Sequence, residues 1–334
     1  MKSDFIYVPI VKWKKGEQEA LKELDDSIKD KIIPLIEITP DFEVTKFEDS
    51  LSNWDNRYFY FDVLQEVYEE KGGEIYFELL NQCDPEYVIP VVFLSDDEEA
   101  IKEAWDYSSN GIAIRITSDD LDELEENISK ITKYIDINDV DLIIDLKDIN
   151  ENNFSEKKIV ARALFQSIPD INLYRRIILS SSAFPQYLSG ISRYKIYQFK
   201  RYDYQLWEFV KKQSAKHNIN LIYSDYCISA PGYFEYKPYM KLSHNLRYTS
   251  EDSFIIIKGE TIKKGGLDSE NVIQSCKMLI NDESYSGKDY SWGDNYIYTR
   301  CNDDVKNFGN LSTWRKVGTN HHITIVINQL SNPS

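Results

Sequence analysis

The chain has 334 residues, of which 42% are hydrophobic, and its formal net charge at pH 7 is −17. This length suits one large domain with an appendage, and the ordinary apolar content argues against intrinsic disorder. So much negative charge excludes a protein that coats duplex DNA by neutralising phosphates, although local basic patches could still hold a nucleotide. No apolar run is long enough to span a bilayer, and the N-terminal segment lacks the apolar core of a signal peptide. We therefore expect a cytoplasmic protein with no membrane partner.

Short runs rich in Val, Ile and Leu recur along the chain, and stretches long enough for a helix separate them. The runs, in order, are YVPIVK, IIPLIE, VIPVVFLSD, IAIR, LIID, RRIILSSS, IYQFKRYD and LIYSD. Continuous apolar runs are typical of strands buried on both faces, as in a parallel sheet. Strand and helix alternating about eight times predict an α/β fold, namely a TIM-barrel-like (β/α)8 barrel.

The helices expected between these strands cover residues 16–28, 59–80, 97–108, 119–134, 155–168 and 204–217. After Asp225 a long connection follows, and then a strand FIIIKGETI, a helix over 268–280 and a final strand ITIVINQL. These are more strands than an eight-stranded barrel needs, so we expect either IYQFK or FIIIK to lie outside it. We predict a barrel over residues 1–227 and a C-terminal α+β extension over 228–334 that packs on it and is a candidate source of its last strand.

Charged residues end several of the predicted strands. Because (β/α)8 enzymes build their active sites at the carboxyl ends of the strands, we expect Glu37, Asp145 and Asp225 to surround one pocket. Carboxylates are the ligands that Mg²⁺ or Mn²⁺ would take there. Lys12 and Arg115, with Lys147 nearby, would clamp a phosphate, which together predicts metal-assisted phosphodiester hydrolysis.

Two other interpretations of this cluster stay open. Paired carboxylates also serve as acid and base on a glycoside, and the Tyr-rich connection after Asp225 would suit sugar stacking. Alternatively, the same charges are structural ion pairs that close the barrel mouth, with Arg115 bridging to Asp145.

A second group of candidates lies near the C-terminus. Trp314 and Arg315 could stack on a base and clamp its phosphate, and His321 or His322 is a candidate general base. His321 and His322 precede a predicted strand, so their side chains should point to opposite faces and at most one should face any pocket. The alternative is a structural loop with one histidine satisfied in the core. Arg247 either binds phosphate or braces the long connection to Asp225.

The four cysteines form no CxxC pair, so their spacing fits neither a zinc site nor a small disulfide framework. We interpret all four as buried free thiols. They are Cys83, Cys227, Cys276 and Cys301.

Two segments near the C-terminus are distinctive, namely SWGDNYI and GNLSTWRKVGTNHHITIV, and so are YVPIVKWKKGEQEALKEL and IIPLIEI near the N-terminus. They resemble the closing and opening parts of the beta protein family of phages and bacteria. RYDYQLW, SDY and NLRYTS also resemble family segments, so the resemblance covers essentially the whole chain. SDY more often begins with glycine in the family, so the loop after Ser224 is expected to turn differently here. The resemblance implies a role in phage–host conflict, such as antiviral defence, and it supplies no catalytic residues.

Our hypothesis is a metal-dependent hydrolase of the phosphodiesterase or nuclease type, whose ligand is a phosphate-containing small molecule or a short nucleic acid. The alternative is a non-catalytic sensor or adaptor that binds a ligand or a protein partner at the same barrel mouth. The candidate catalytic residues are Glu37, Asp145, Asp225 and His321, with Glu37, Asp145 and Asp225 as metal ligands. The candidate ligand-binding residues are Lys12, Arg115, Lys147, Arg201, Arg247, Trp314 and Arg315.

Overall fold

The computed structural model describes residues 5–215, 219–235, 237, 239–262, 266–302 and 305–332. The chain divides into two compact units. The first comprises Met1–Trp13, Lys31–Ala183 and Tyr202–Tyr226, and the second comprises Lys14–Asp30, Phe184–Arg201 and Cys227–Ser334. Among the described residues, no helix combines the length and the apolar character that crossing a bilayer requires.

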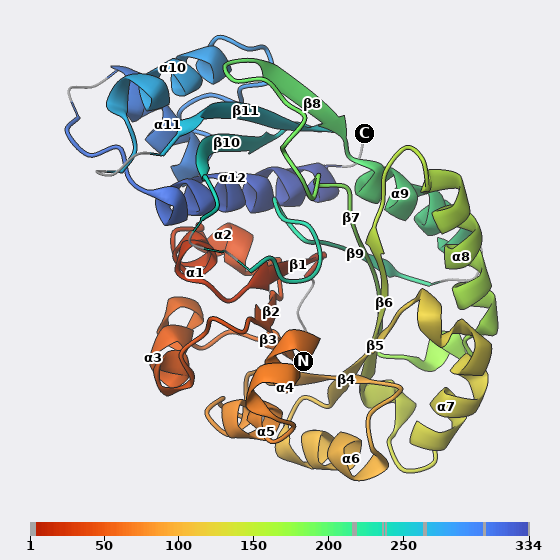
Figure 1. Ribbon diagram of the computed structural model, residues 1–334. Helices are drawn as coiled ribbons and strands as arrows, with labels where there is room; N and C mark the ends of the chain where they lie inside the picture. The colour runs from red at the N-terminus through yellow and green to blue at the C-terminus, as the bar shows by residue number, and fades with distance from the viewer. Residues whose placement is uncertain are drawn as a thin grey trace. The chain divides into compact units, whose positions relative to one another are not determined.

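Eight strands close the first unit into a barrel in the order β1-β2-β3-β4-β5-β6-β7-β9, and neighbouring strands are parallel (Figure 1). The predicted (β/α)8 barrel is thereby confirmed. Its strands are nearly continuously buried, as expected for a sheet covered on both faces. They are β1 (Tyr7–Lys12), β2 (Leu35–Ile38), β3 (Phe59–Val63), β4 (Val88–Phe93), β5 (Ile112–Ile116), β6 (Val140–Asp148), β7 (Arg176–Ser182) and β9 (Leu221–Asp225).

Helices connect the barrel strands, and α6, α7 and α8 run along the outside of the barrel (Figure 1). Each presents an apolar stripe to the strands; α7, for example, buries Leu124, Ile128 and Ile131 at helical spacing. The helices are α3 (Phe47–Leu51), α4 (Gln65–Lys71), α5 (Ile75–Leu80), α6 (Glu98–Tyr107), α7 (Leu124–Ile131), α8 (Phe154–Ser167) and α9 (Tyr202–Ser214).

The third barrel strand lies where a helix was predicted. The sequence predicts a helix from residue 59 to 80, but Phe59–Val63 is β3, and α4 and α5 follow it. Aromatic and β-branched residues favour strands, and here they sit between two barrel strands. Because β3 completes the barrel, both IYQFK and FIIIK lie outside it, and the described part of residues 228–334 supplies none of its strands.

The middle of the barrel interior is apolar, and charged side chains fill the interior at the amino end of the strands. The Asp141 carboxylate accepts bonds from Arg175 at 2.8 Å, from Arg176 at 3.0 Å and from the hydroxyl of Tyr60 at 2.8 Å. Burial raises the pKa of Tyr60 well above its usual value, so its hydroxyl stays a donor. The apolar layer includes Val8, Ile10, Leu35, Ile89, Val91, Ala113, Ile143, Ile178 and Ile222.

The second unit is an antiparallel three-stranded sheet, ordered β10-β11-β8, packed against helices. Its core joins Leu246 and Ile255 of the sheet to Cys276 of α10, Ile297 of α11 and Val317 of α12. Helix α12 runs beside β10 (Figure 1). The elements are α1 (Lys15–Lys22), α2 (Asp26–Lys29), β8 (Ile196–Lys200), β10 (Ser243–Thr249), β11 (Ser253–Thr261), α10 (Ser269–Ile280), α11 (Trp292–Asn302) and α12 (Leu311–Ser331).

The predicted C-terminal strand is wrong, because ITIVINQL forms part of helix α12. Asn310 begins this helix with a capping box: its side-chain oxygen accepts from the Thr313 backbone N–H, and the Thr313 hydroxyl oxygen accepts from the Asn310 backbone N–H. Residues 317–327 are all buried, so the helix has no polar stripe from which its period could be read.

Candidate functional site

Arg115 on β5 lies at the centre of a buried ion-pair network. Its Nη1 lies 2.9 Å from Glu37 Oε1 and also contacts Asp62 Oδ2. Its Nε and Nη2 donate to Asp145 Oδ2 at 3.1 and 2.7 Å. None of these four side chains is more than 2% exposed. Isolated buried charges are very costly, so each is stable here only because the others compensate it.

Strand register explains why distant residues meet here. Lys12, Glu37 and Asp62 are partners in register on β1, β2 and β3. Side chains two residues apart on a strand share a face, and Ile10 and Leu35 belong to the barrel interior. Lys12 and Glu37 therefore point toward the interior at the carboxyl ends of their strands, where barrel enzymes place their active sites.

Tyr226 and Lys147 complete the network at the barrel rim. The Tyr226 hydroxyl donates to Asp145 Oδ2 at 2.6 Å and accepts from Arg115 Nη2 at 2.6 Å. Lys147 Nζ lies 2.8 Å from the same Asp145 oxygen, and its side chain is 41% exposed. A register shift between Asp145 and Asp148, with a φ of 56° at Lys147, brings this lysine to the rim. Lys147 is thus the member of the network that reaches solvent.

The network separates the titration of its carboxyl groups. Burial raises the pKa of Asp62 to about 6, although the charge of Arg115 opposes the rise. Burial would also raise the pKa of Asp145, but the charges of Lys147 and Arg115 outweigh it and hold that pKa well below its usual value. Asp62 can therefore exchange a proton near neutral pH while Asp145 stays ionised, and such a separation is common at acid–base sites.

Asp225 does not join this network, so its predicted convergence with Glu37 and Asp145 is wrong. Its carboxylate accepts bonds from the hydroxyls of Tyr7 at 2.6 Å and Tyr223 at 2.9 Å. Tyr223, on the same strand face, packs against Trp207 of α9 in the helical layer. Successive strand residues point to opposite faces, so Asp225 faces outward.

The three predicted metal ligands consequently do not form an oxygen cage for Mg²⁺ or Mn²⁺. The Arg115 guanidinium already lies between the carboxylates of Glu37 and Asp145, where a shared cation would have to sit. The alternative hypothesis of structural ion pairs, with Arg115 bridging to Asp145, agrees with these contacts.

Three buried polar atoms inside the barrel make no hydrogen bond within the described residues. They are Glu37 Oε2, Ser180 Oγ and Ser224 Oγ. Ser180 and Ser224 are partners in register on β7 and β9, on the same faces as the interior residues Ile178 and Ile222. Buried polar atoms normally have partners, so these atoms can accept a water or a ligand group.

Trp314 and His321 belong to the interior of the second unit. Trp314 is 3% exposed, its Nε1 donates to the Phe308 carbonyl at 3.0 Å, and its ring meets His244 edge to face. It therefore offers no surface on which a base could stack. His321 Nδ1 lies 2.8 Å from Asp294 Oδ2, and its Nε2 lies 2.8 Å from the Thr249 carbonyl oxygen. Both ring nitrogens of His321 are engaged, which leaves neither for general base catalysis.

The two histidines do not point to opposite faces, because consecutive residues of a helix differ by about 100°. His322 lies on α12 with its Nδ1 2.9 Å from Thr249 Oγ1. Arg201 is also buried, and it donates to the Gln329 side chain at 2.8 Å and to the Ser250 and Glu251 carbonyls. It braces a loop rather than presenting its guanidinium to a ligand.

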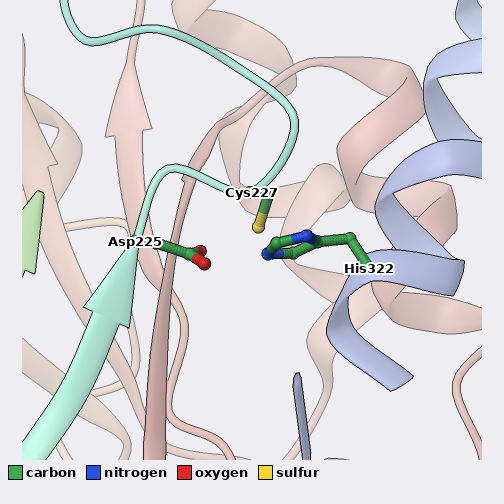
Figure 2. A group of neighbouring side chains, drawn as sticks. All are labelled: Asp225, Cys227 and His322. Atoms are coloured by element: carbon green, nitrogen blue, oxygen red, sulfur yellow. The ribbon is translucent and has the colours of Figure 1, made fainter. Parts of the chain in front are cut away.

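Figure 2 shows Cys227 and His322 with Asp225. Cys227 follows β9 with a φ of 51°, and its Sγ lies within 4.8 Å of a His322 ring nitrogen. Both belong to the second unit and are buried, as predicted for the thiol. Asp225 belongs to the first unit, so we assign no metal site to the three.

Sequence reasoning missed Asp62 and Tyr226. Asp62 ends the apolar part of FYFDV much as Glu37 ends IIPLIE, a signal hidden by the helix assigned to that segment. Tyr226 follows LIYSD, and only the strand register shows that it faces the interior. Arg247 and Arg315, predicted separately, are brought together in the second unit, where both donate to the Ile228 carbonyl oxygen.

Comparison with known proteins gives one family. The family model described as beta protein matches residues 7–328, nearly the whole chain. No curated protein matches the chain significantly. The match runs through both units, including the barrel strands that carry Arg115 and its partners. The chain belongs to the beta protein family.

Proposed function

We propose that the carboxyl end of the barrel binds a phosphate group between Lys12 and Lys147 and hydrolyses a phosphodiester by acid–base catalysis. The observation that carries this proposal is Asp62, a buried carboxyl group with a pKa raised to about 6 among cationic side chains. Groups with such perturbed pKa values at strand ends are the usual candidates for proton transfer.

The charges support an anionic ligand once Asp62 is protonated. Three cationic and three carboxylate side chains end here: Lys12, Arg115, Lys147, Glu37, Asp62 and Asp145. Their charges sum to zero when all six groups are ionised. Protonation of Asp62 leaves one positive charge in excess, and the phosphate would offset it. Ligand binding and proton uptake by Asp62 should therefore be coupled.

In the proposed reaction a water attacks phosphorus as the bond to the leaving oxygen breaks. Glu37, whose Oε2 has no partner in the described structure, takes a proton from the water. Asp62 gives its proton to the leaving oxygen, and Arg115 holds both carboxylates in place. No metal ion takes part, because the guanidinium already occupies the space between the carboxylates.

A second candidate is a non-catalytic sensor that uses the same end of the barrel. Arg115, Lys147 and Tyr226 all donate hydrogen bonds to Asp145, which favours a sensor. Such a network is rigid, so only the residues at its rim would respond to a ligand. Either activity would operate in phage–host conflict, the setting that the family resemblance suggests.

Hydrolysis of bis(4-nitrophenyl) phosphate between pH 5 and 8 tests the proposal. Turnover should depend on a group with a pKa near 6 and should persist in EDTA. Asp62→Asn should abolish it, whereas Asp122→Asn, at an exposed position, should not change it. Turnover lost in EDTA would restore the metal-assisted mechanism. If neither this diester nor nucleotide substrates are cleaved, but nucleotides still bind and binding weakens in Lys147→Gln, the sensor is the better description.

A further inference from the structure

We propose that Arg247 and Arg315 form a separate phosphate-binding site within the second unit. Arg247 lies on β10 and Arg315 on α12. Their Nη1 atoms donate to the same acceptor, the carbonyl oxygen of Ile228, at 2.8 and 3.0 Å. Two guanidinium groups are therefore held side by side, although their charges repel each other.

The charges around the pair are not balanced within this unit. Glu17 Oε1 lies 3.4 Å from Arg315 Nε, and among the described residues no other carboxylate forms an ion pair with Arg315 or Arg247. Burial and the neighbouring charge of Arg315 lower the pKa of Arg247 well below its usual value. An anion placed between the guanidinium groups would remove this repulsion, because it would interact favourably with both.

Unused hydrogen-bond donors make the pair suitable for an oxyanion. Arg247 Nε and Nη2 and Arg315 Nη2 have no hydrogen-bond acceptor among the described residues. Guanidinium groups bind phosphate and carboxylate through paired N–H donors. A phosphate group has oxygens for both arginines at once, whereas a carboxylate would satisfy only one of them bidentately. The geometry therefore favours phosphate.

The surrounding packing holds both guanidinium groups in place. The Arg247 guanidinium lies 4.9 Å from the centre of the Phe184 ring. Arg315 Nη1 also donates to Ser229 Oγ at 2.7 Å. One turn after Arg315, Gly318 lets α12 approach β10, since a Cβ there would lie 2.8 Å from the Arg247 carbonyl oxygen. A preformed site loses less conformational entropy when its ligand binds.

Thermal unfolding with inorganic phosphate tests the site, with sodium chloride at matched ionic strength and sodium acetate as comparisons. Phosphate should raise the melting temperature of the wild-type protein by several degrees more than either salt, by mass action. Arg247→Gln and Arg315→Gln should each lose this increment. Without phosphate Arg247→Gln should be no less stable than wild type, because it relieves the like-charge contact, whereas Arg315→Gln also removes the ion pair with Glu17 and should be somewhat less stable. Arg193→Gln, which removes an exposed arginine of the same unit paired with Glu260, should keep the increment.

The barrel end is also proposed to bind phosphate, so Lys147→Gln separates the two sites. Stabilisation that survives Lys147→Gln and disappears in Arg247→Gln belongs to the arginine pair, even if the barrel end proves inactive. Stabilisation that disappears in Lys147→Gln and survives in Arg247→Gln overturns the site in the second unit. If both variants are less stable than wild type but phosphate stabilises them as much as it stabilises wild type, the arginine pair is a structural brace. If acetate stabilises the wild-type protein as much as phosphate does, the choice of phosphate is contradicted.

Discussion

Arg115 donates two hydrogen bonds to a single oxygen of Asp145, from Nε at 3.1 Å and from Nη2 at 2.7 Å. Tyr226 and Lys147 approach the same Oδ2 atom at 2.6 and 2.8 Å, and the Lys147 backbone N–H donates to Oδ1 at 3.0 Å. Several donors thus converge on one carboxylate oxygen. Asp145 is consequently anchored more firmly than Glu37, which retains an oxygen without a partner in the described structure.

Arg115→Met should destabilise the first unit strongly. Methionine fills much of the volume but leaves the carboxylates of Glu37, Asp62 and Asp145 facing one another without a guanidinium. Removing one partner of a buried ion pair typically costs about 3–5 kcal/mol. Urea unfolding should show this loss, while Arg193→Met should change the free energy of unfolding by less than about 0.5 kcal/mol. A loss below about 1 kcal/mol for Arg115→Met would show that the network contributes little to stability.

Asp62 should make stability fall as the pH rises from about 4 to about 6. Its pKa in the folded protein is raised to about 6, above the ordinary value of about 3.9 in an unfolded chain. The folded state therefore binds the proton more tightly, and this contribution is complete below the unfolded pKa and lost as the pH passes the folded pKa. The whole change is on the order of 2–3 kcal/mol.

Comparing urea midpoints of wild type and Asp62→Asn across this range isolates the effect. The unfolding free energy of wild type should fall relative to that of Asp62→Asn as the pH rises, because the amide of the variant cannot ionise. Asp122→Asn, which removes an exposed carboxylate, should parallel wild type. If the unfolding free energies of Asp62→Asn and wild type change in parallel from pH 4 to 7, Asp62 does not titrate in this range. The proposed reaction would then have no proton donor.

The barrel and part of its network could be predicted because the signals are local. Continuous apolar runs identify most strands, and the charged residue at the end of a run identifies Glu37, Arg115 and Asp145. What the runs do not show is which way a terminal residue points. Asp225 and Tyr226 are neighbours at the end of β9, yet one faces the helical layer and the other the interior. That choice follows from strand register, which depends on residues far away in the chain.

The second unit is harder to predict for a different reason. Its last helix is buried over residues 317–327, so hydrophobic periodicity cannot distinguish it from a strand. Trp314 and His321 look like ligand-binding and catalytic residues in the sequence, because polar and aromatic side chains that cluster near a chain end resemble a site. In the structure the partners that bury them, such as Asp294 and Phe308, come from segments whose proximity no local pattern reveals.

His244 should destabilise the second unit as the pH falls from about 6.5 to about 4. Burial lowers its pKa to about 4, and neither ring nitrogen has a hydrogen-bond partner in the described structure. The unfolded chain therefore binds the proton first, so this contribution to stability is present above the unfolded pKa and is lost as the pH falls through the folded pKa.

His244→Phe should remove this acid sensitivity with little loss of stability at pH 7, since phenylalanine can keep the edge-to-face contact with Trp314 and leaves no polar atom unsatisfied. Thermal unfolding of both proteins at pH 5 and pH 7 would measure it. A variant that is as acid-sensitive as wild type would assign the sensitivity to other groups.

Gly318→Ala should destabilise the second unit, although alanine normally favours a helix over glycine by about 1 kcal/mol. A Cβ at this position would lie 2.6 Å from Ile228 Cδ1 and 2.8 Å from the Arg247 carbonyl oxygen. The isoleucine methyl can rotate away, but the carbonyl belongs to β10, which is hydrogen-bonded to β11. Moving α12 outward instead would loosen the core around Val317, so we expect a net loss of about 1–3 kcal/mol, as for other overpacked sites.

Gly190→Ala is the matched control, because a Cβ there would meet nothing within 4 Å. Chemical denaturation should leave that variant close to wild type. The Gly318 variant should also lose phosphate stabilisation, since displacing α12 moves Arg315 away from Arg247 while both arginines remain in the chain. A Gly318→Ala protein that is more stable than wild type and still responds fully to phosphate would show that the close approach of α12 to β10 is not what holds the arginine pair together.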